Sequence, residues 1–218
     1  MHKLNELRLA YISDHLCKYF GRDINDKHPL HGFKVVDIGC GGGILAEAMA
    51  VLGADVTGFD VVEKNLNIAS LHAREQGLSI DYRLMTAAEL AASGASFDVV
   101  LNMEVVEHVA DLPAFMRDCN QLTGSVGVMF VATINRTLLA WLFAIVGAEY
   151  VLRWLPRGTH RWQLFRKPRE ISALIAEGGL VSTDLTGVAV NPLTRSMRCT
   201  RFTQVNYMMF CSHAPENA

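Results

Sequence analysis

Residues 34–60, KVVDIGCGGGILAEAMAVLGADVTGFD, contain two short apolar runs with a cluster of glycines and an Ala-rich segment between them. The first run, residues 34–38, is apolar and β-branched, which is typical of a buried parallel strand. After the glycines, residues 44–52 predict a helix, and residues 55–59 predict a second strand that ends on Asp60. These parts together are typical of the nucleotide-binding half of a doubly wound α/β fold, in which the terminal acid can accept both ribose hydroxyls.

The spacing of the glycines argues against a dinucleotide as the ligand. The phosphate-binding pattern G-x-G-x-x-G fails from Gly39, because Ile44 occupies its last position, and from Gly41 it ends on Ala46. Asp37 lies inside the first strand, where a carboxylate would repel a pyrophosphate but would suit an ammonium or a sulfonium group. A dinucleotide oxidoreductase remains an alternative.

Residues 37–43, DIGCGGG, resemble the first motif of class I S-adenosylmethionine-dependent methyltransferases. The resemblance implies that the methionine part of the methyl donor lies against the backbone of Gly39 and Gly41, and that Asp60 binds the ribose. From the residues alone, two alternatives stay open. Asp60 would cap the following helix, or the glycines would form a tight turn without a ligand.

Apolar periodicity predicts that strands and helices alternate along most of the chain. The expected helices cover residues 4–20, 44–52, 63–76, 86–92, 112–122 and 168–177, and the expected strands cover residues 34–38, 55–59, 80–84, 97–103, 126–133, 180–190 and 204–212. We expect one domain over residues 1–218 with a Rossmann-like class I methyltransferase fold. Its seven-stranded, mostly parallel sheet lies between helices, and a helical insertion at about residues 135–165 follows the fifth strand.

The composition limits the partners and the compartment. Half of the 218 residues are hydrophobic, which is enough to bury one sizeable core. The net charge of −2 provides no basic field, so nucleic acid is not expected as a partner. The five cysteines are scattered without a C-x-x-C pair, which indicates a reducing compartment. The first residues match neither a signal peptide nor a transit peptide, so we expect a cytoplasmic location.

Glu104, Glu107 and His108 follow the fourth expected strand at spacings i, i+3 and i+4. On a helical turn, this spacing would put the three side chains on one face. Two carboxylates and an imidazole can hold a divalent cation, and Mg²⁺ suits the oxygen ligands. Two other interpretations stay open. The acids would only stabilise a helix N-terminus, or His108 would be a general base that takes a proton from the substrate.

Seven strings that span nearly the whole chain carry a closer resemblance. They are LNELRLAYI at residues 4–12, DIGCGGG at 37–43, MEVVEHV at 103–109, TINRT at 133–137, VGAEYVLR at 146–153, PRGTH at 156–160 and VNYM at 205–208. With these strings the chain resembles the ubiquinone-biosynthesis O-methyltransferases, which methylate catechol-type hydroxyls of polyprenylated intermediates.

That resemblance implies an activity and a set of site residues. A methyl group would pass from S-adenosylmethionine to a phenolic oxygen of a polyprenylated catechol, either 3-demethylubiquinol or 2-polyprenyl-6-hydroxyphenol. Arg8 and Met103 would contact the donor, Arg8 through the donor's carboxylate. The acid and histidine cluster, Glu104, Glu107 and His108, would bind the metal and act in catalysis. The alternatives are a methyltransferase of another small phenol and a non-catalytic module that holds a lipid or a partner protein.

Residues 138–146, LLAWLFAIV, form the most apolar part of the insertion. The run is too short to span a bilayer. Aromatic residues and arginines surround it, which predicts a helix lying in the membrane interface. Because a polyprenyl substrate resides in the bilayer, we expect peripheral contact with lipid at a bacterial inner membrane, or on the mitochondrial matrix side if a presequence has been removed. Other ubiquinone-pathway enzymes are further expected partners. A lid helix or a dimer contact is the alternative.

Overall fold

The computed structural model describes residues 2–143, 162–191, 194 and 196–214. Its helices are α1 His2–Phe20, α2 Ile44–Val51, α3 Glu63–Glu75, α4 Ala87–Ala92, α5 Leu112–Leu122, α6 Leu138–Ala140 and α7 Pro168–Ala176, with a 3₁₀ helix at Trp162–Leu164. Its strands are β1 Lys34–Ile38, β2 Asp55–Asp60, β3 Asp81–Leu84, β4 Phe97–Met103, β5 Thr123–Ile134, β6 Leu180–Val190, β7 Met197–Thr200 and β8 Asn206–His213.

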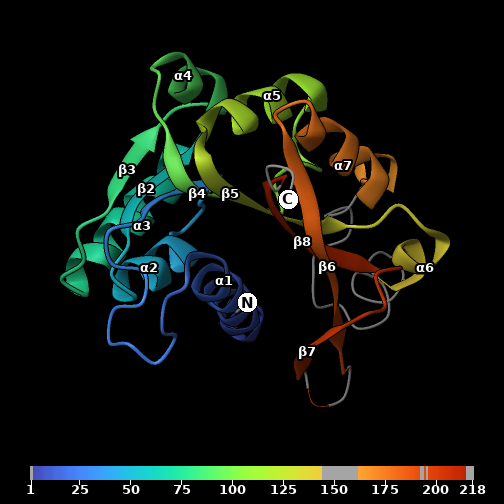
Figure 1. Ribbon diagram of the computed structural model, residues 1–218, viewed down its shortest axis with the longest axis horizontal. Helices are drawn as coiled ribbons and strands as arrows, with labels where there is room; N and C mark the ends of the chain where they lie inside the picture. Colours follow the sequence, from blue (N-terminus) through green and yellow to red (C-terminus); the bar gives the residue numbers. More distant parts are fainter. Residues whose placement is uncertain (1, 144–161, 192–193, 195, 215–218) are drawn as a thin grey trace.

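The strands of the described residues form one sheet in the order β3-β2-β1-β4-β5-β8-β6-β7 (Figure 1). The first five in that order pair in parallel, and the last three pair antiparallel. Helices α2 to α5 supply the crossover connections that parallel strands require. The predicted mostly parallel sheet between helices is confirmed, but the sheet has eight strands and not seven. The additional strand, β7, lies between the strands predicted at residues 180–190 and 204–212, where no strand is predicted, and pairs with the end of β6.

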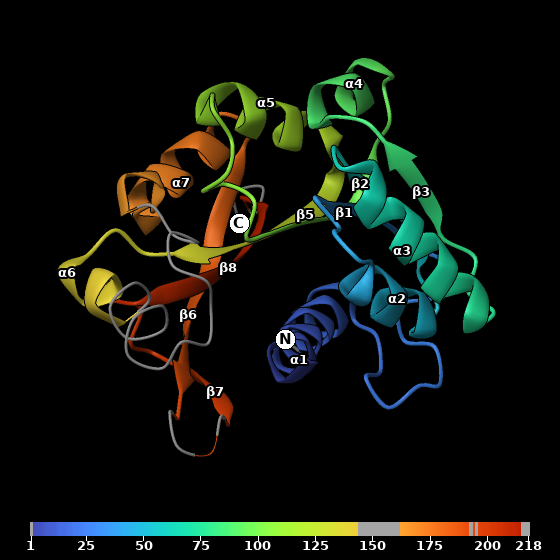
Figure 2. The same ribbon diagram turned by 180° about the vertical axis from the view of Figure 1, so that it is seen from behind.

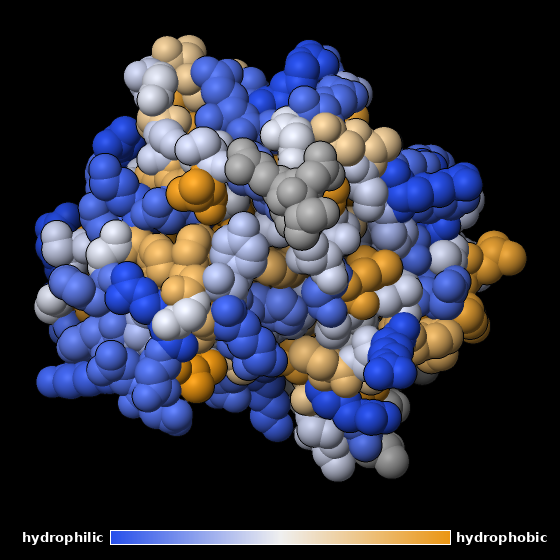
Figure 3. Space-filling view, viewed as in Figure 1, coloured by the Kyte–Doolittle hydropathy of each residue, from blue (hydrophilic) through white to orange (hydrophobic). Residues whose placement is uncertain are grey.

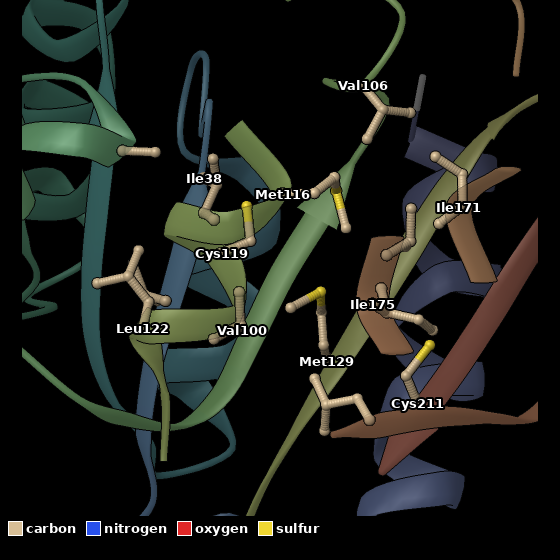
Figure 4. Packing of buried hydrophobic residues seen from close by; sticks show 14 of the residues in the cluster. Ile38, Val100, Val106, Met116, Cys119, Leu122, Met129, Ile171, Ile175 and Cys211 are labelled. Atoms are coloured by element: carbon tan, nitrogen blue, oxygen red, sulfur yellow. The ribbon is translucent and has the colours of Figure 1, made fainter. Parts of the chain in front are cut away.

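Two buried hydrophobic clusters cover the two faces of the sheet. One cluster joins α4, α5 and α7 to Val100 and Met129. Figure 4 shows side chains of α5 and α7 on either side of these two strand residues. The other joins α1 and α2 to Val99 and Phe130. Neighbouring residues of a strand point to opposite faces, so β4 and β5 contribute to both clusters. Figures 1 and 2 show the two groups of helices on opposite sides of the sheet.

The carboxyl ends of β1, β2 and β4 meet at one edge of the sheet. Ile38 of β1 pairs with Phe59 of β2 and with Asn102 of β4. The chain leaves β1 between these two neighbours, which is the place where ligands bind in open α/β sheets. The candidate residues that end or follow these strands therefore come together there.

The insertion is described only at its two ends. Helix α6 begins at Leu138, where the Thr137 hydroxyl accepts a hydrogen bond from the Ala140 N–H at 3.0 Å. Residues 144–161 lie outside the described residues, and with them lies most of the predicted insertion, including the end of the interfacial helix expected over residues 138–146.

Candidate active site

Asp60 organises the glycine turn from the end of β2. Its buried carboxylate accepts hydrogen bonds from the Gly41 N–H at 2.9 Å, from the Val62 N–H at 2.8 Å and from the Asn65 side-chain amide at 3.2 Å. The interpretation of Asp60 as a helix cap is wrong, because Val62 is the N-cap of α3. The structure therefore brings Asp60 and the Gly39–Gly41 turn together as the sequence predicts, and it adds a direct bond between them.

Asp37 is buried inside β1, beside this turn. Burial raises its pKa to about 7, and the nearby Asp60 also raises it, whereas the positive charge of Arg8 and a hydrogen bond from the Ala46 backbone lower it. A buried carboxyl group with this pKa is ready to accept a cationic ligand, because a nearby positive charge would favour its ionised form.

Asp37→Asn is expected to flatten the pH dependence of stability. Because the folded-state pKa of Asp37, about 7, lies above its ordinary value, the folded protein keeps a proton that the unfolded chain has released. Stability therefore falls as the pH rises from about 4 to 7. Asn cannot hold or release this proton. The variant is therefore expected to have a difference in unfolding free energy between pH 5 and pH 8 that is smaller than that of wild type by about 2–3 kcal/mol. Urea unfolding at both pH values measures it, with exposed Asp55→Asn as the control; identical profiles for wild type and Asp37→Asn would contradict the assignment.

Arg8 reaches from α1 to the loop that follows β4, where its guanidinium pairs with the Glu104 carboxylate. The Glu104 backbone has φ 61°, in the left-handed region that side-chain-bearing residues rarely adopt. The Glu104 N–H donates to the Ala132 carbonyl of β5 at 2.7 Å. Met103, partly buried at the end of β4, precedes Glu104 and packs against the cluster that includes α1 and α2.

Glu107 is buried below this loop and accepts a hydrogen bond from the Thr133 hydroxyl at 2.7 Å. Burial raises its pKa to about 7 and the charge of Glu104 adds to the rise, whereas the bond from Thr133 opposes it. The His108 side chain is exposed in the same turn, and the backbone N–H of His108 donates to the Val105 carbonyl at 2.8 Å.

The prediction that Glu104, Glu107 and His108 share one face of a helical turn is wrong. Residues 106–108 form a turn and not a helix, and the positive φ of Glu104 directs its carboxylate to Arg8. Among the described residues, no group of three or more His, Cys, Asp or Glu side chains is arranged to hold a metal ion. The three side chains therefore do not fit a Mg²⁺ site in this arrangement.

Thr133 is a site residue that the sequence analysis missed. It lies at the carboxyl end of β5, the parallel neighbour of β4, and binds Glu107. A polar residue at the end of the next parallel strand was the available signal, because strand ends of a parallel sheet meet at one edge.

Comparisons with known proteins show which proteins the chain is similar to. A family described as a methyltransferase domain matches residues 36–131. A ubiquinone biosynthesis O-methyltransferase of Rhizobium etli is 52% identical over 209 residues, which cover 96% of this chain and 84% of that protein. The protein of the same name in Brucella anthropi is 54% identical over the same shares of the two chains. Magnesium protoporphyrin IX methyltransferase of Synechocystis, solved with bound SAH, has a TM-score of 0.68 at 20% identity and covers 97% of this chain and 84% of its own. That likeness shows a shared fold.

Proposed function

Since this chain belongs to the family of ubiquinone biosynthesis O-methyltransferases, we propose that it methylates a phenolic oxygen of a polyprenylated catechol. Its class of reaction is O-methylation with S-adenosylmethionine as the donor. The catechol as the acceptor, its polyprenyl tail and the choice of hydroxyl are the parts that we propose. The observation that carries the proposal is identity of 52% or more along 96% of the chain, because this span contains both the donor turn and the acid and histidine turn.

Each donor residue has a role that its chemistry supports. Asp60 would accept the ribose hydroxyls, and the backbone of the Gly39–Gly41 turn would approach the methionine part. Asp37 suits the donor's ammonium group, and Arg8 suits its carboxylate. Held in this way, the sulfonium methyl would face the end of β4, where Glu107 and His108 lie.

The acceptor must lose a proton before it can attack the methyl group. A neutral phenol is a poor nucleophile, and its pKa is about 10. His108, exposed next to buried Glu107, is the residue that we propose as the general base. The bond forms between the phenolic oxygen and the methyl carbon as the bond from that carbon to sulfur breaks, which leaves S-adenosylhomocysteine.

Mass spectrometry of products from a panel of short-tailed catechols tests the proposed activity. We expect a monomethylated catechol that forms only when S-adenosylmethionine is present. A protein that is stabilised by S-adenosylhomocysteine but methylates no catechol would contradict the proposal and favour a binding module. A larger thermal shift with NADH than with S-adenosylhomocysteine would favour a dinucleotide enzyme instead.

The divalent cation that the resemblance implies stays a prediction. Bound beside a catechol, it would lower the pKa of one hydroxyl. The prediction requires Glu104, Glu107 and His108 to leave their present arrangement, which does not fit a metal. In that case EDTA is expected to abolish turnover, Mg²⁺ to restore it, and binding of S-adenosylhomocysteine to persist throughout. Full turnover by metal-free protein would contradict it and leave His108 as the base to test next.

We also propose that the start of the insertion touches the membrane surface. Around α6, large hydrophobic side chains point into solvent, and Leu138 is 79% exposed. Figure 3 shows hydrophobic atoms projecting at the edge where Figure 1 places α6. The exposed residues are Leu138, Leu139, Trp141, Leu142, Phe143 and Trp162. Among the described residues, no helix has both the length and the apolar character needed to traverse a bilayer. The exposed side chains support peripheral contact with a lipid surface. The cytoplasmic face of a bacterial inner membrane is the location that we propose for this contact.

Replacing both Leu139 and Phe143 with Ser is expected to reduce recovery with liposomes in a flotation assay, because it removes apolar area that would enter the interface. Replacing Val51 and Ile68 with Ser, both exposed on the helices α2 and α3, is the matched control. Equal flotation of the wild type and the Leu139/Phe143 variant would contradict membrane contact.

A further inference from the structure

Arg8 lies among three carboxyl groups that serve different parts of the site. Its guanidinium pairs with Glu104, and its charge lowers the pKa of both Asp37 and Glu107 against the effect of their burial. Asp37 belongs to the donor side and Glu107 to the acceptor side. The charge of Arg8 therefore acts on both the donor side and the acceptor side of the site. In this structure its ion pair is with Glu104.

The two members of this ion pair differ in their freedom to move. The Arg8 side chain is 12% exposed, and the next turn of α1 is anchored in the core by Tyr11 and Ile12. The Glu104 side chain is 46% exposed and projects from a loop. An exchange of partners would therefore displace Glu104 and leave Arg8 in place.

The backbone of Glu104 is in a conformation that its contacts must maintain. Among the described residues, Glu104 is the single non-glycine residue with a positive φ. Such a conformation persists where the surroundings enforce it. Two contacts hold Glu104 in this conformation, namely the hydrogen bond from its backbone N–H to the Ala132 carbonyl and the ion pair of its carboxylate with Arg8. Loss of the ion pair removes one of them and allows the loop to relax.

The amino-acid end of the donor competes for the same guanidinium. Its ammonium would match buried Asp37, which lies close enough to Arg8 for the charge of Arg8 to lower its pKa. The carboxylate on the same carbon would then lie near the Arg8 guanidinium, which can bind it through two parallel hydrogen bonds. We propose that Arg8 exchanges Glu104 for the donor's carboxylate, and that Glu104 then turns toward Glu107 and His108. This exchange rests on the proposed function, because it needs a donor with a free carboxylate.

The exchange sets an order of binding and explains the arrangement of the acceptor side. With Arg8 on Glu104, the acid and histidine cluster is incomplete, as the structure shows. Once the donor takes Arg8, the three side chains can approach one another around the acceptor. Arg8 is then a positioning residue that makes the acceptor side depend on the donor.

Titration calorimetry with two ligands tests the exchange. S-adenosylhomocysteine carries the ammonium and the carboxylate but no sulfonium charge, and 5′-methylthioadenosine carries none of the three. Glu104→Gln is expected to bind S-adenosylhomocysteine about two- to fivefold more tightly than wild type, because it removes the competitor for Arg8. Its affinity for 5′-methylthioadenosine is expected to stay unchanged. Glu75→Gln, which removes one exposed charge on α3, is the control.

Two further measurements separate the exchange from a purely structural ion pair. In an Arg8→Gln background, Glu104→Gln is expected to have no further effect on S-adenosylhomocysteine. In wild type, S-adenosylhomocysteine is expected to raise the affinity for a short-tailed catechol, and Glu104→Gln is expected to abolish this coupling. Unchanged or weaker binding of S-adenosylhomocysteine by Glu104→Gln, or equal tightening of both ligands, would overturn the exchange while methyl transfer by wild type still stands. A wild type that binds neither ligand would overturn the proposed function and the exchange with it.

Discussion

Asp60→Ala is expected to weaken binding of S-adenosylhomocysteine by about 10- to 150-fold, which corresponds to about 1.5–3 kcal/mol. The variant loses the acceptor for the ribose hydroxyls. It also leaves the Gly41 N–H, the Val62 N–H and the Asn65 amide without the carboxylate that they share. The glycine turn then loses its side-chain contact with β2 and keeps the backbone hydrogen bond from the Cys40 N–H to the Phe59 carbonyl at 3.0 Å. Titration calorimetry on protein with an unchanged circular dichroism spectrum measures the loss.

Asn65→Ala is the matched control for this variant. It removes the longest of the three hydrogen bonds, at 3.2 Å, and keeps the carboxylate and both backbone contacts. We therefore expect a loss of affinity close to the lower end of the range for Asp60→Ala or below it. Donor affinity that survives Asp60→Ala in a folded protein would remove Asp60 from the site.

The arrangement of Asp37, the glycine turn and Asp60 could be predicted because its signals are local. β1 and β4 have the bounds that their apolar runs predict, residues 34–38 and 97–103. In a parallel sheet, two strands that end at the same edge bring the residues after them together, whatever the loops do in between. β1 and β2 also pair in parallel, so this rule predicts that the glycine turn after β1 lies beside Asp60 at the end of β2 and near Asp37.

The acceptor side could not be predicted from spacing alone. Placing Glu104, Glu107 and His108 on one face assumed helical backbone, whereas Glu104 has φ 61°. That conformation is held by two contacts that are distant in the sequence, the ion pair with Arg8, 96 residues away, and the hydrogen bond from the Glu104 N–H to the Ala132 carbonyl. Contacts of this kind leave no periodic signal, so the sequence identified the residues and the structure had to supply their directions.

The eighth strand was missed for a related reason. β7 is four residues long, with the sequence MRCT, and its single alternation of apolar and polar residues is the shortest pattern that can indicate a strand. It becomes a strand because β6 extends past β8, so that Gly187–Val190 of β6 can pair with it. The pairing partner, and not the local sequence, determines this element.

Gly43→Ala is expected to destabilise the protein by about 3–5 kcal/mol, the largest effect on stability that we predict. Gly43 is the N-cap of α2, with φ 79° in the left-handed region. A Cβ atom there would lie 2.2 Å from the Tyr82 hydroxyl oxygen and 2.9 Å from the Ala69 Cβ. Either α2 or the side chains against it must move, which would also displace the donor turn. Urea unfolding measures the destabilisation.

Gly41→Ala is the control that measures the cost of the left-handed backbone without the steric overlap of the new Cβ atom. Gly41 has a similar φ of 54°, but a Cβ there meets nothing within 4 Å among the described residues. Its cost is therefore expected to be the strain alone, about 1–2 kcal/mol. Equal destabilisation by Gly41→Ala and Gly43→Ala would contradict the role of the overlap.

Tyr82→Phe is expected to recover about 1–2 kcal/mol of the loss in the Gly43→Ala background, because it removes the atom nearest to the new Cβ. In the wild-type background the same change is expected to be nearly neutral, since the buried Tyr82 hydroxyl has no hydrogen-bond partner among the described residues. Recovery would be partial, because the left-handed φ and the contact with Ala69 remain. If the changes in unfolding free energy of the two single variants sum to the change of the double variant, the Tyr82 hydroxyl does not contact the new Cβ atom. A positive coupling would place this tyrosine directly beneath the backbone that receives the methyl donor.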